Sequence, residues 1–265
     1  MPELPEVACF RKHFERTSLN RKIASAHLKD RRIVRGTSPE TLENDLIGQT
    51  FVSALQHGKY LFAGTDGGKW LVLHFGMTGF LQYFENPEDD PPYDRFVIGF
   101  TDGGFLAYIN QRMLGWIGLA WEPAEVIRQK GLGPAALDDL FDFALFRKNL
   151  SGRKGEAKPA LMDQKLMAGI GNIYSDEILF QARLHPKTKV DTLSDAQLRT
   201  IFDKMKEVLR TAVDRDADVE RFPESYLLRN RKKRGVCPAC GGKLETGKVA
   251  GRTAYFCPGC QPRQD

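Results

Sequence analysis

The sequence predicts an α+β protein of several domains, in which one helix leads an antiparallel β-sandwich and a helical domain and a small cysteine-bearing module follow. Three observations support this fold class. Short apolar runs separated by turn residues fill residues 22–121. Helical periodicity dominates residues 123–213. Two Cys-x-x-Cys pairs lie close to the C-terminus.

The N-terminal half begins with a predicted helix, because Val7, Phe10 and Phe14 recur at helical spacing. Two hairpins in the strand region share the turn sequence Thr-Asp-Gly-Gly, at residues 65–68 and 101–104. The runs on both sides of each turn are apolar or alternating, as in half-buried strands. We therefore expect a sandwich or barrel led by one helix.

The second half is predicted to be helical. Ser194 and Gln197 have the spacing of a capping box at the start of the last long helix. Residues 214–235 are polar and weakly periodic, which predicts a mobile connection. The five expected helices cover residues 123–130, 137–149, 158–168, 173–183 and 194–213. The expected domains are 1–131, 132–235 and 236–265.

Composition is that of an ordinary globular protein, with 42% hydrophobic and 28% charged residues in a chain of 265. No apolar run approaches the roughly 18 residues of a membrane span, and no secretory signal is present. We expect an intracellular protein without membrane contact. The net charge is +5, but residues 229–265 carry nine Lys/Arg and two Asp/Glu, a local net of +7. This asymmetry fits a polyanion-binding surface as well as a solvated tail.

Cys237, Cys240, Cys257 and Cys260 predict a four-cysteine zinc ribbon, with sixteen residues between the two pairs. Each pair can form a knuckle that presents two thiolates, and a hairpin between the knuckles closes a tetrahedral site. A redox pair is the alternative, which the doubled motif disfavours. Because four protein ligands leave no open position, we expect one structural zinc ion.

A glycine turn, Gly169-Ile-Gly171-Asn172, divides two amphipathic helices. Exposed amides at the start of the following helix, Asn172-Ile-Tyr174, with the Asn172 side chain and nearby Lys158, predict a phosphate seat. A plain helical corner capped by Asn172 is the alternative. In the ribbon, Arg252 lies where a basic hairpin tip could contact phosphate, although such ribbons also bind proteins.

The first seven residues, Met-Pro-Glu-Leu-Pro-Glu-Val, resemble the start of the formamidopyrimidine-DNA glycosylase/endonuclease VIII family. Further motifs of that family follow in order along nearly the whole chain. Leu4 in place of glycine favours the formamidopyrimidine branch. The motifs are His-Gly-Lys-Tyr-Leu at 57–61, His-Phe-Gly-Met-Thr-Gly at 74–79, Pro-Ala-Leu-Met-Asp at 159–163, the helix-two-turn-helix segment through 169–174 and the zinc ribbon.

The resemblance implies a bifunctional DNA glycosylase and abasic-site lyase of base excision repair, acting on oxidised or ring-opened bases. Removal of Met1 would expose the secondary amine of Pro2, which attacks C1′ and forms a Schiff base before β,δ-elimination. Glu3 is assigned to protonation of the sugar ring oxygen and Glu6 to proton transfers. From the residues alone, both carboxylates could simply favour a helix N-terminus.

The family also implies the residues that hold DNA. Lys59 would contact phosphate near the nucleophile, and His74, Asn172 and Arg252 would contact other phosphates. Met77, Arg112 and Leu114 would fill the space left by the extruded base. The alternatives are an exposed strand cation for Lys59, a satisfied strand histidine for His74 and core positions for Met77 and Leu114.

Two regions depart from the formamidopyrimidine branch. Residues 110–115 read Asn-Gln-Arg-Met-Leu-Gly where that branch usually has Asp-Pro-Arg-Arg-Phe-Gly, and residues 215–234 are a shortened version of a lesion-covering segment. These altered loops suggest an abasic-site lyase with little glycosylase activity as one rival hypothesis. A non-catalytic DNA-binding protein is another, because a helix-two-turn-helix segment and a ribbon with a basic run would serve binding alone. A zinc-ribbon adaptor would not explain the N-terminus. We expect a monomer in the bacterial cytoplasm and nucleoid that binds damaged double-stranded DNA without a small-molecule cofactor.

Overall fold

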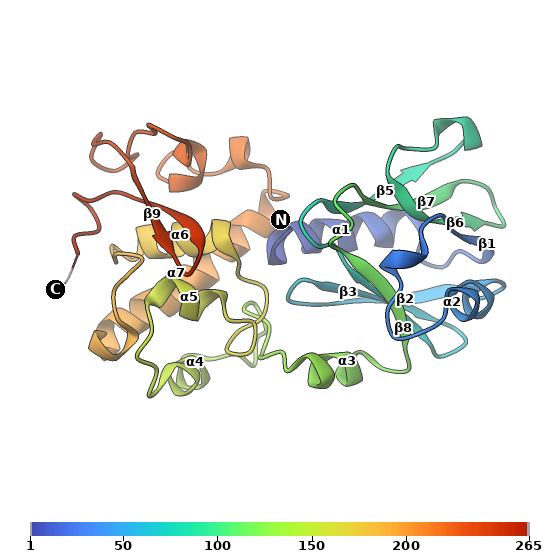
Figure 1. Ribbon diagram of the computed structural model, residues 1–265, viewed down its shortest axis with the longest axis horizontal. Coiled ribbons are helices and arrows are strands. Elements are labelled where there is room, and N and C mark those ends of the chain that lie inside the picture. The colour runs from blue at the N-terminus through green and yellow to red at the C-terminus, as the bar shows by residue number, and fades with distance from the viewer. Residues whose placement is uncertain (1, 264–265) are drawn as a thin grey trace. The chain divides into compact units, whose positions relative to one another are not determined.

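The computed structural model describes residues 2–263 (Figure 1). The chain divides into two compact units, which we describe separately. Unit 1 consists mainly of Glu6–Lys130, and unit 2 consists of Glu3–Pro5 together with the chain from Gly131 onward. The first two residues of the N-terminal helix α1 (Leu4–Thr17), Leu4 and Pro5, therefore belong to unit 2. No helix of the described residues is long and apolar enough to cross a membrane.

Unit 1 contains two antiparallel sheets of four strands each, in the orders β1-β6-β7-β5 and β2-β3-β4-β8. Its core draws side chains from both sheets and from α1, for example Leu73, Phe96 and Phe14. The expected helix-led antiparallel β-sandwich is confirmed. The strands are β1 (Ile23–Leu28), β2 (Phe51–His57), β3 (Tyr60–Thr65), β4 (Trp70–His74), β5 (Gly79–Phe84), β6 (Asp94–Phe100), β7 (Phe105–Asn110) and β8 (Trp116–Ala120).

Both Thr-Asp-Gly-Gly sequences form the predicted hairpin turns, between β3 and β4 and between β6 and β7. Gly68 and Gly103 adopt φ of 84° and 93°, which L side chains rarely adopt, so the turns need glycine there. Two helices, α2 (Pro39–Leu46) and α3 (Pro123–Lys130), complete unit 1 with two short 3₁₀ segments (Arg31–Ile33 and Pro87–Asp89).

Unit 2 is helical and ends in a two-stranded ribbon, as predicted. Its core gathers on α6 and α7 and includes Tyr174, Ile178 and Met205. The predicted capping box of Ser194 and Gln197 is present at the start of α7. The elements are α4 (Phe143–Leu150), α5 (Ala157–Met162), α6 (Asn172–Gln181), α7 (Asp195–Asp214), β9 (Glu245–Val249) and β10 (Arg252–Phe256), with 3₁₀ segments at Val190–Thr192, Val219–Arg221 and Leu227–Asn230.

Two helices are shorter than predicted. The helix expected over 137–149 begins at Phe143, after Asp142, whose carboxylate accepts the Leu145 amide as an N-cap. The helix expected over 158–168 ends at Met162, since the Asp163 carboxylate accepts the Lys165 amide and turns the chain. Apolar residues also occur at 137–142 and 163–168, which lie outside the helices. Hydrophobic periodicity alone therefore overestimated the lengths of both helices.

Candidate active site

Glu3 is the anion at the start of α6. Its carboxylate accepts the backbone amides of Gly171 at 2.6 Å, Ile173 at 2.8 Å and Tyr174 at 3.2 Å. The Glu3 residue has 0% exposure, and Gly171, at the N-cap position, offers no side-chain cap of its own. The carboxylate therefore caps a helix that lies 168 residues away along the chain, where the helix dipole favours negative charge.

The two glycines of the turn allow the N-terminal segment to approach. The Leu4 amide donates to the Gly169 carbonyl at 3.0 Å. A Cβ at Gly169, where φ is 117°, would lie 2.7 Å from Leu4, and one at Gly171 would lie 2.5 Å from the Glu3 carboxylate. Any larger residue at either position would push the N-terminal segment away from α6.

This arrangement corrects the predicted phosphate seat. We expected exposed amides at Gly171 and the start of α6 to receive DNA phosphate, but Gly171 is buried, and Glu3 accepts the amides of Gly171, Ile173 and Tyr174. The side chain of Asn172 is half-buried, and its Oδ1 has no hydrogen-bond partner within residues 2–263. The phosphate contact predicted for Asn172 remains a prediction.

Lys158 is a second correction. The side chains of Lys158 and Asp176 both have 0% exposure and form an ion pair, and the Lys158 ammonium also donates to the Asn172 carbonyl at 3.0 Å. Arg231 and the Tyr255 amide reach the other Asp176 oxygen at 2.9 and 3.2 Å. Lys158 is therefore not a surface cation that awaits a phosphate, because a buried carboxylate already neutralises it. The prediction overlooked Asp176.

Pro2 is half-buried and directly precedes the anchored Glu3. The peptide bond between them limits how far Pro2 can move from the start of α6. Glu6 lies in the first turn of α1 and is also half-buried. The loss of Met1 and the catalytic roles of Pro2, Glu3 and Glu6 remain predictions.

Lys59 and His74 lie at one end of the second sheet of unit 1. Lys59 directly follows Gly58, which turns the chain between β2 and β3 with φ of 56°. His74 ends β4, where its ring packs 4.9 Å from that of Tyr60. Burial, and then repulsion by Lys59 and two other cations, lowers the pKa of His74 to about 4. The imidazole is thus neutral at pH 7, and any contact with phosphate would be a hydrogen bond from a neutral ring.

The two loops that carry the predicted wedge residues pack against each other. The Arg112 amide donates to the Thr78 hydroxyl at 3.1 Å, next to Met77. A Cβ on Gly76, where φ is 60°, would lie 2.4 Å from the Leu114 carbonyl carbon, so only glycine fits. Leu114 is 47% exposed, which excludes the core position that was its alternative. Unit 1 therefore brings Met77, Arg112 and Leu114 into one loop cluster.

The residues beneath these loops were not predicted from the sequence. The Asn110 amide donates to the Tyr108 hydroxyl at 2.8 Å, and that hydroxyl donates to the His74 carbonyl at 2.8 Å. A Cβ at Gly115 would lie 2.1 Å from both donor groups. The chain Asn110–Tyr108–His74 thus fixes the loop of residues 111–115 to the end of β4. A buried asparagine at the end of an apolar strand was the available signal.

The four cysteines form the predicted metal site. Cys237 and Cys260 have sulfur atoms 3.8 Å apart, those of Cys240 and Cys257 are 3.5 Å apart, and all four lie within 4.8 Å of one another. A tetrahedron with Zn–S bonds of about 2.3 Å has sulfur atoms about 3.8 Å apart, so the cluster fits zinc. The ribbon binds a structural zinc ion. Arg252 is exposed at the start of β10, directly after the hairpin turn.

The segment predicted as a mobile connection is packed onto α6 instead. The buried carboxylate of Glu177 accepts the amides of Leu227 at 3.2 Å and Leu228 at 2.8 Å. Leu227 is fully buried in a small core with Phe180 and the zinc ribbon. The segment therefore joins the helices to the ribbon as a folded part of unit 2. Burial raises the pKa of Glu177 to about 7.

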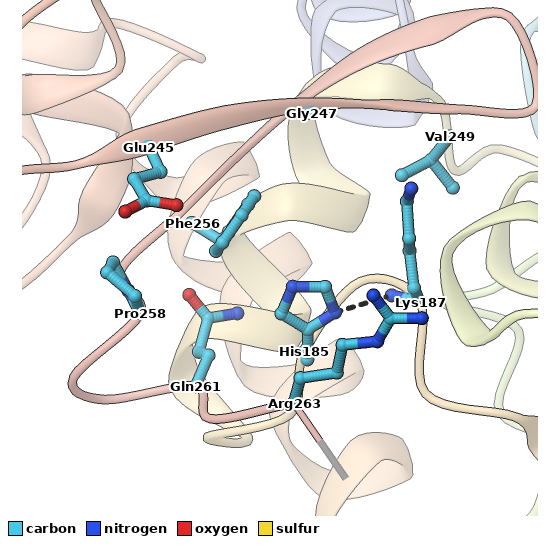
Figure 2. Close-up of a pocket in the computed structure, with 9 residues that line it drawn as sticks. All are labelled: His185, Lys187, Glu245, Gly247, Val249, Phe256, Pro258, Gln261 and Arg263. Carbon is cyan, nitrogen blue, oxygen red and sulfur yellow. Dashed lines mark hydrogen bonds between the residues drawn. The ribbon is translucent and has the colours of Figure 1, made fainter. Parts of the chain in front are cut away.

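Unit 2 also contains a cavity of about 330 Å³ beside the ribbon (Figure 2). His185, Lys187 and Arg263 gather on one side of it and Glu245 on the other. The His185 ring accepts the Lys187 amide at 3.1 Å and packs on Phe256. None of the predicted catalytic or DNA-binding residues lines this cavity.

Comparison with known protein families covers the chain almost from end to end. The profile of the formamidopyrimidine-DNA glycosylase N-terminal domain matches residues 1–117. That of the H2TH domain of the same enzymes matches residues 132–224, and that of a zinc finger found in FPG and IleRS matches residues 235–263.

Individual proteins give the same result. The formamidopyrimidine-DNA glycosylase of Heliobacterium modesticaldum is 35% identical over 98% of this chain and 100% of its own length. That of Arabidopsis thaliana is 32% identical over 98% of this chain and 71% of its own. The solved structure of the Lactococcus lactis enzyme bound noncovalently to DNA containing an abasic site is 30% identical. It covers 98% of this chain and 100% of its own, with a TM-score of 0.89.

A solved complex of MutM with DNA containing carbocyclic 8-oxo-G is also 30% identical, covers 99% of this chain and all of its own, and has a TM-score of 0.89. Matches of this extent, together with the zinc ribbon, leave one assignment. The chain belongs to the formamidopyrimidine-DNA glycosylase family of DNA-binding base excision repair enzymes.

Proposed function

We propose that the protein is a bifunctional glycosylase and abasic-site lyase whose nucleophile is the amine of Pro2. The observation that carries the proposal is the Glu3 carboxylate, which is held by three amides at the start of α6. This anchor fixes the residue next to Pro2, so the amine is held beside a buried negative charge. An oriented nucleophile of this kind loses little entropy on reaching the transition state.

The reaction begins when the Pro2 nitrogen attacks C1′ of the damaged nucleotide. The N–C1′ bond forms, the glycosidic bond breaks and the base leaves with the bonding electron pair. The attack leaves the Pro2 nitrogen positively charged and still carrying its proton. We assign to the Glu3 carboxylate the transfer of this proton from the nitrogen to the sugar ring oxygen, which opens the ring and leaves an iminium ion between Pro2 and C1′. The negative charge of the carboxylate also stabilises the positive charge of the iminium.

The iminium makes the C2′ proton acidic. Loss of that proton expels the 3′-phosphate, and a second elimination expels the 5′-phosphate. Hydrolysis of the remaining iminium ion returns Pro2 as a free amine. We assign Glu6, half-buried in the first turn of α1, to these proton transfers, and Lys59 to the phosphate beside the reacting sugar. The expected product is a one-nucleotide gap with a phosphate at each end.

We further propose that damaged duplex DNA is bound by His74, Asn172 and Arg252 through phosphates, while Met77, Arg112 and Leu114 fill the space of the extruded base. The exposed Arg112 and Leu114 and the packed loops that carry them support this role. We propose that residues 1–131, 132–235 and 236–265 act as the catalytic, helical and ribbon parts of a monomer. It would work on genomic DNA inside a bacterial cell without a small-molecule cofactor.

A second candidate is an abasic-site lyase with little glycosylase activity. It is favoured by the aliphatic Leu114 in the wedge loop and by residues 215–234, which pack on α6 through Glu177. Duplexes that carry an abasic site, an oxidised guanine or an oxidised pyrimidine separate the two candidates. Cleavage confined to the abasic duplex would favour the lyase.

The proposed chemistry is tested by borohydride reduction during the reaction. The protein should form a covalent adduct with an abasic duplex and, without borohydride, should leave a gap with phosphates at both ends. Protein with an acetylated N-terminus is the control and should form no adduct. Failure of the unmodified protein to form an adduct on abasic DNA would overturn the Pro2 mechanism.

A further inference from the structure

A row of aromatic side chains crosses three strands of unit 1 beyond the predicted contact His74. Tyr60, His74 and Trp116 are direct partners on β3, β4 and β8. Their ring centroids are 4.9 Å apart for Tyr60 and His74, and 6.1 Å apart for His74 and Trp116. Trp116 is 7% exposed, so it is a rigid support and not an exposed stacking surface. We call these three residues, with Arg35 and Lys130, the Trp116 cluster.

Two cations lie over the Trp116 ring. The Lys130 ammonium is 5.0 Å and the Arg35 guanidinium carbon 5.8 Å from its centroid. Backbone contacts hold the chain at both residues close to Trp116. Lys130 ends α3, whose Val126 shares a small core with Trp116. The Arg35 amide donates to the Ile117 carbonyl at 2.9 Å, next to Trp116.

Neither cation is neutralised within the described part of the chain. Arg35 and Lys130 are exposed and form no ion pair among residues 2–263. Arg128, on the same helix as Lys130, pairs with Glu122 at 3.2 Å. Lys59, Arg35 and Lys130 all lie close enough to His74 that their positive charges repel a proton on its ring. Like charges held together at a surface favour binding of an anion.

We propose that Lys130 and Arg35 bind one further phosphate of the DNA backbone, next to the phosphates assigned to Lys59 and His74. This inference rests on the proposed function. Packing against Trp116 restricts the long side chains of both cations in advance, so less conformational entropy is lost when phosphate binds. Unit 1 thus follows the strand for an additional nucleotide, without regard to base sequence.

The first test measures how affinity for duplex DNA depends on salt. Each phosphate contact contributes about 0.9 to the slope of log K against log salt concentration. Lys130→Ala and Arg35→Ala should each reduce the magnitude of the slope by up to this amount, whereas Arg128→Ala, the matched control, should leave it unchanged. Lys130→Gln keeps most of the stem over Trp116 and removes the charge, so it should behave as Lys130→Ala does. The proposal would be overturned if Lys130→Ala and Arg35→Ala had the same slope as the unmodified protein. It would also be overturned if Lys130→Gln had that slope.

The second test locates the phosphate. A single neutral methylphosphonate is moved along each strand of the duplex, and the affinities of the unmodified protein and Lys130→Ala are compared. At one position the unmodified protein should lose several-fold in affinity while Lys130→Ala loses nothing. If both proteins respond alike at every position, no phosphate depends on Lys130.

Undamaged duplex and borohydride trapping separate this proposal from the proposed function. Backbone contacts do not require a lesion, so the change in slope should also appear on undamaged DNA. If the unmodified protein traps abasic DNA but the slopes of the variants are unchanged, the phosphate site is wrong and the Pro2 chemistry stands. If the slopes change and no adduct forms, the Pro2 chemistry is wrong and the phosphate site stands.

Discussion

Lys130 and Lys158 carry the same ammonium group, yet unit 1 and unit 2 use it in opposite ways. Lys130 is exposed over Trp116 and has no ion-pair partner among the described residues. Lys158 is fully buried and bound to Asp176. Arg35 and Arg231 repeat the contrast, because Arg35 remains exposed while Arg231 also bonds to Asp176. In these two pairs of residues, the cation of unit 1 stays at the surface and the cation of unit 2 holds parts of that unit together.

The difference shows that the location of an acid decides what a basic residue does. Asp176 connects α5 through Lys158, the segment before the ribbon through Arg231 and β10 through the Tyr255 amide. No carboxylate of comparable burial meets Arg35 or Lys130 within residues 2–263. A cation that is already neutralised contributes little to DNA binding, so the contrast predicts which substitutions reduce stability and which reduce affinity.

The largest effect should follow removal of zinc. Structural zinc contributes about 10–16 kcal/mol to the folding of small zinc fingers at pH 7. Chelation should therefore unfold the ribbon of residues 236–263 and remove Arg252 from the DNA, while the sheets of unit 1 remain folded. A zinc-sensitive dye would measure release of the metal, and circular dichroism would follow unfolding of the ribbon. A ribbon that retained its structure after complete loss of the metal would contradict this account.

The next largest effect is expected for Asp176→Asn, which leaves Lys158 charged and fully buried. Breaking a buried pair on one side costs about 3–5 kcal/mol. Urea unfolding followed by circular dichroism reports mainly on the helices of unit 2. The matched control is Glu207→Gln on α7, which breaks the exposed pair with Lys204 and should cost at most about 1 kcal/mol. Equal losses for the two variants would show that the buried network has no special weight.

His74 should make unit 1 sensitive to acid. Its pKa is lowered from 6.5 to about 4 in the folded protein. Between these values the unfolded chain binds a proton that the folded unit does not, so stability falls as pH falls from 6.5 to 4. The loss is up to about 3 kcal/mol, because one pKa unit corresponds to about 1.4 kcal/mol. Tryptophan fluorescence reports on unit 1, which contains all three tryptophans. His74→Asn should flatten this dependence, and parallel curves would refute it.

The smallest effect sharpens the comparison of surface cations. Arg252→Ala should reduce the magnitude of the salt slope by about 0.9 and Lys130→Ala by up to this amount, and the two reductions should add in the double variant, because the two cations contact different phosphates. Titrations of a fluorescent duplex at several salt concentrations measure both values. A double variant no weaker than either single variant would mean that the two cations share one phosphate.

Local features were predictable from the sequence. The Thr-Asp-Gly-Gly turns, the Ser194–Gln197 capping box and the two cysteine pairs each depend on residues close together in the chain, so spacing alone reveals them. The length of α5 was overestimated because Met162, Leu166 and Met167 continue the apolar pattern past the turn at Asp163. Apolar spacing does not reveal a side chain that redirects the backbone.

Long-range pairings were not predictable. The bond from Gly171 to Glu3 joins residues 168 apart, and nothing local distinguishes that helix start from an open phosphate site. The burial of Lys158 depends on Asp176, which lies on a different helix. The Trp116 cluster depends on the register of β3, β4 and β8, which pattern alone does not fix. In each case the residue could be picked out from the sequence, but the distant residue that it contacts could not.

The central claim is that Pro2 is the nucleophile. Its most direct test is mass spectrometry of the borohydride-trapped complex with an abasic duplex, after digestion of DNA and protein. We predict that the remnant of the sugar lies on the N-terminal nitrogen of the tryptic peptide Pro2–Arg11. A remnant on Lys59 or any other lysine, with that peptide unmodified, would contradict the claim.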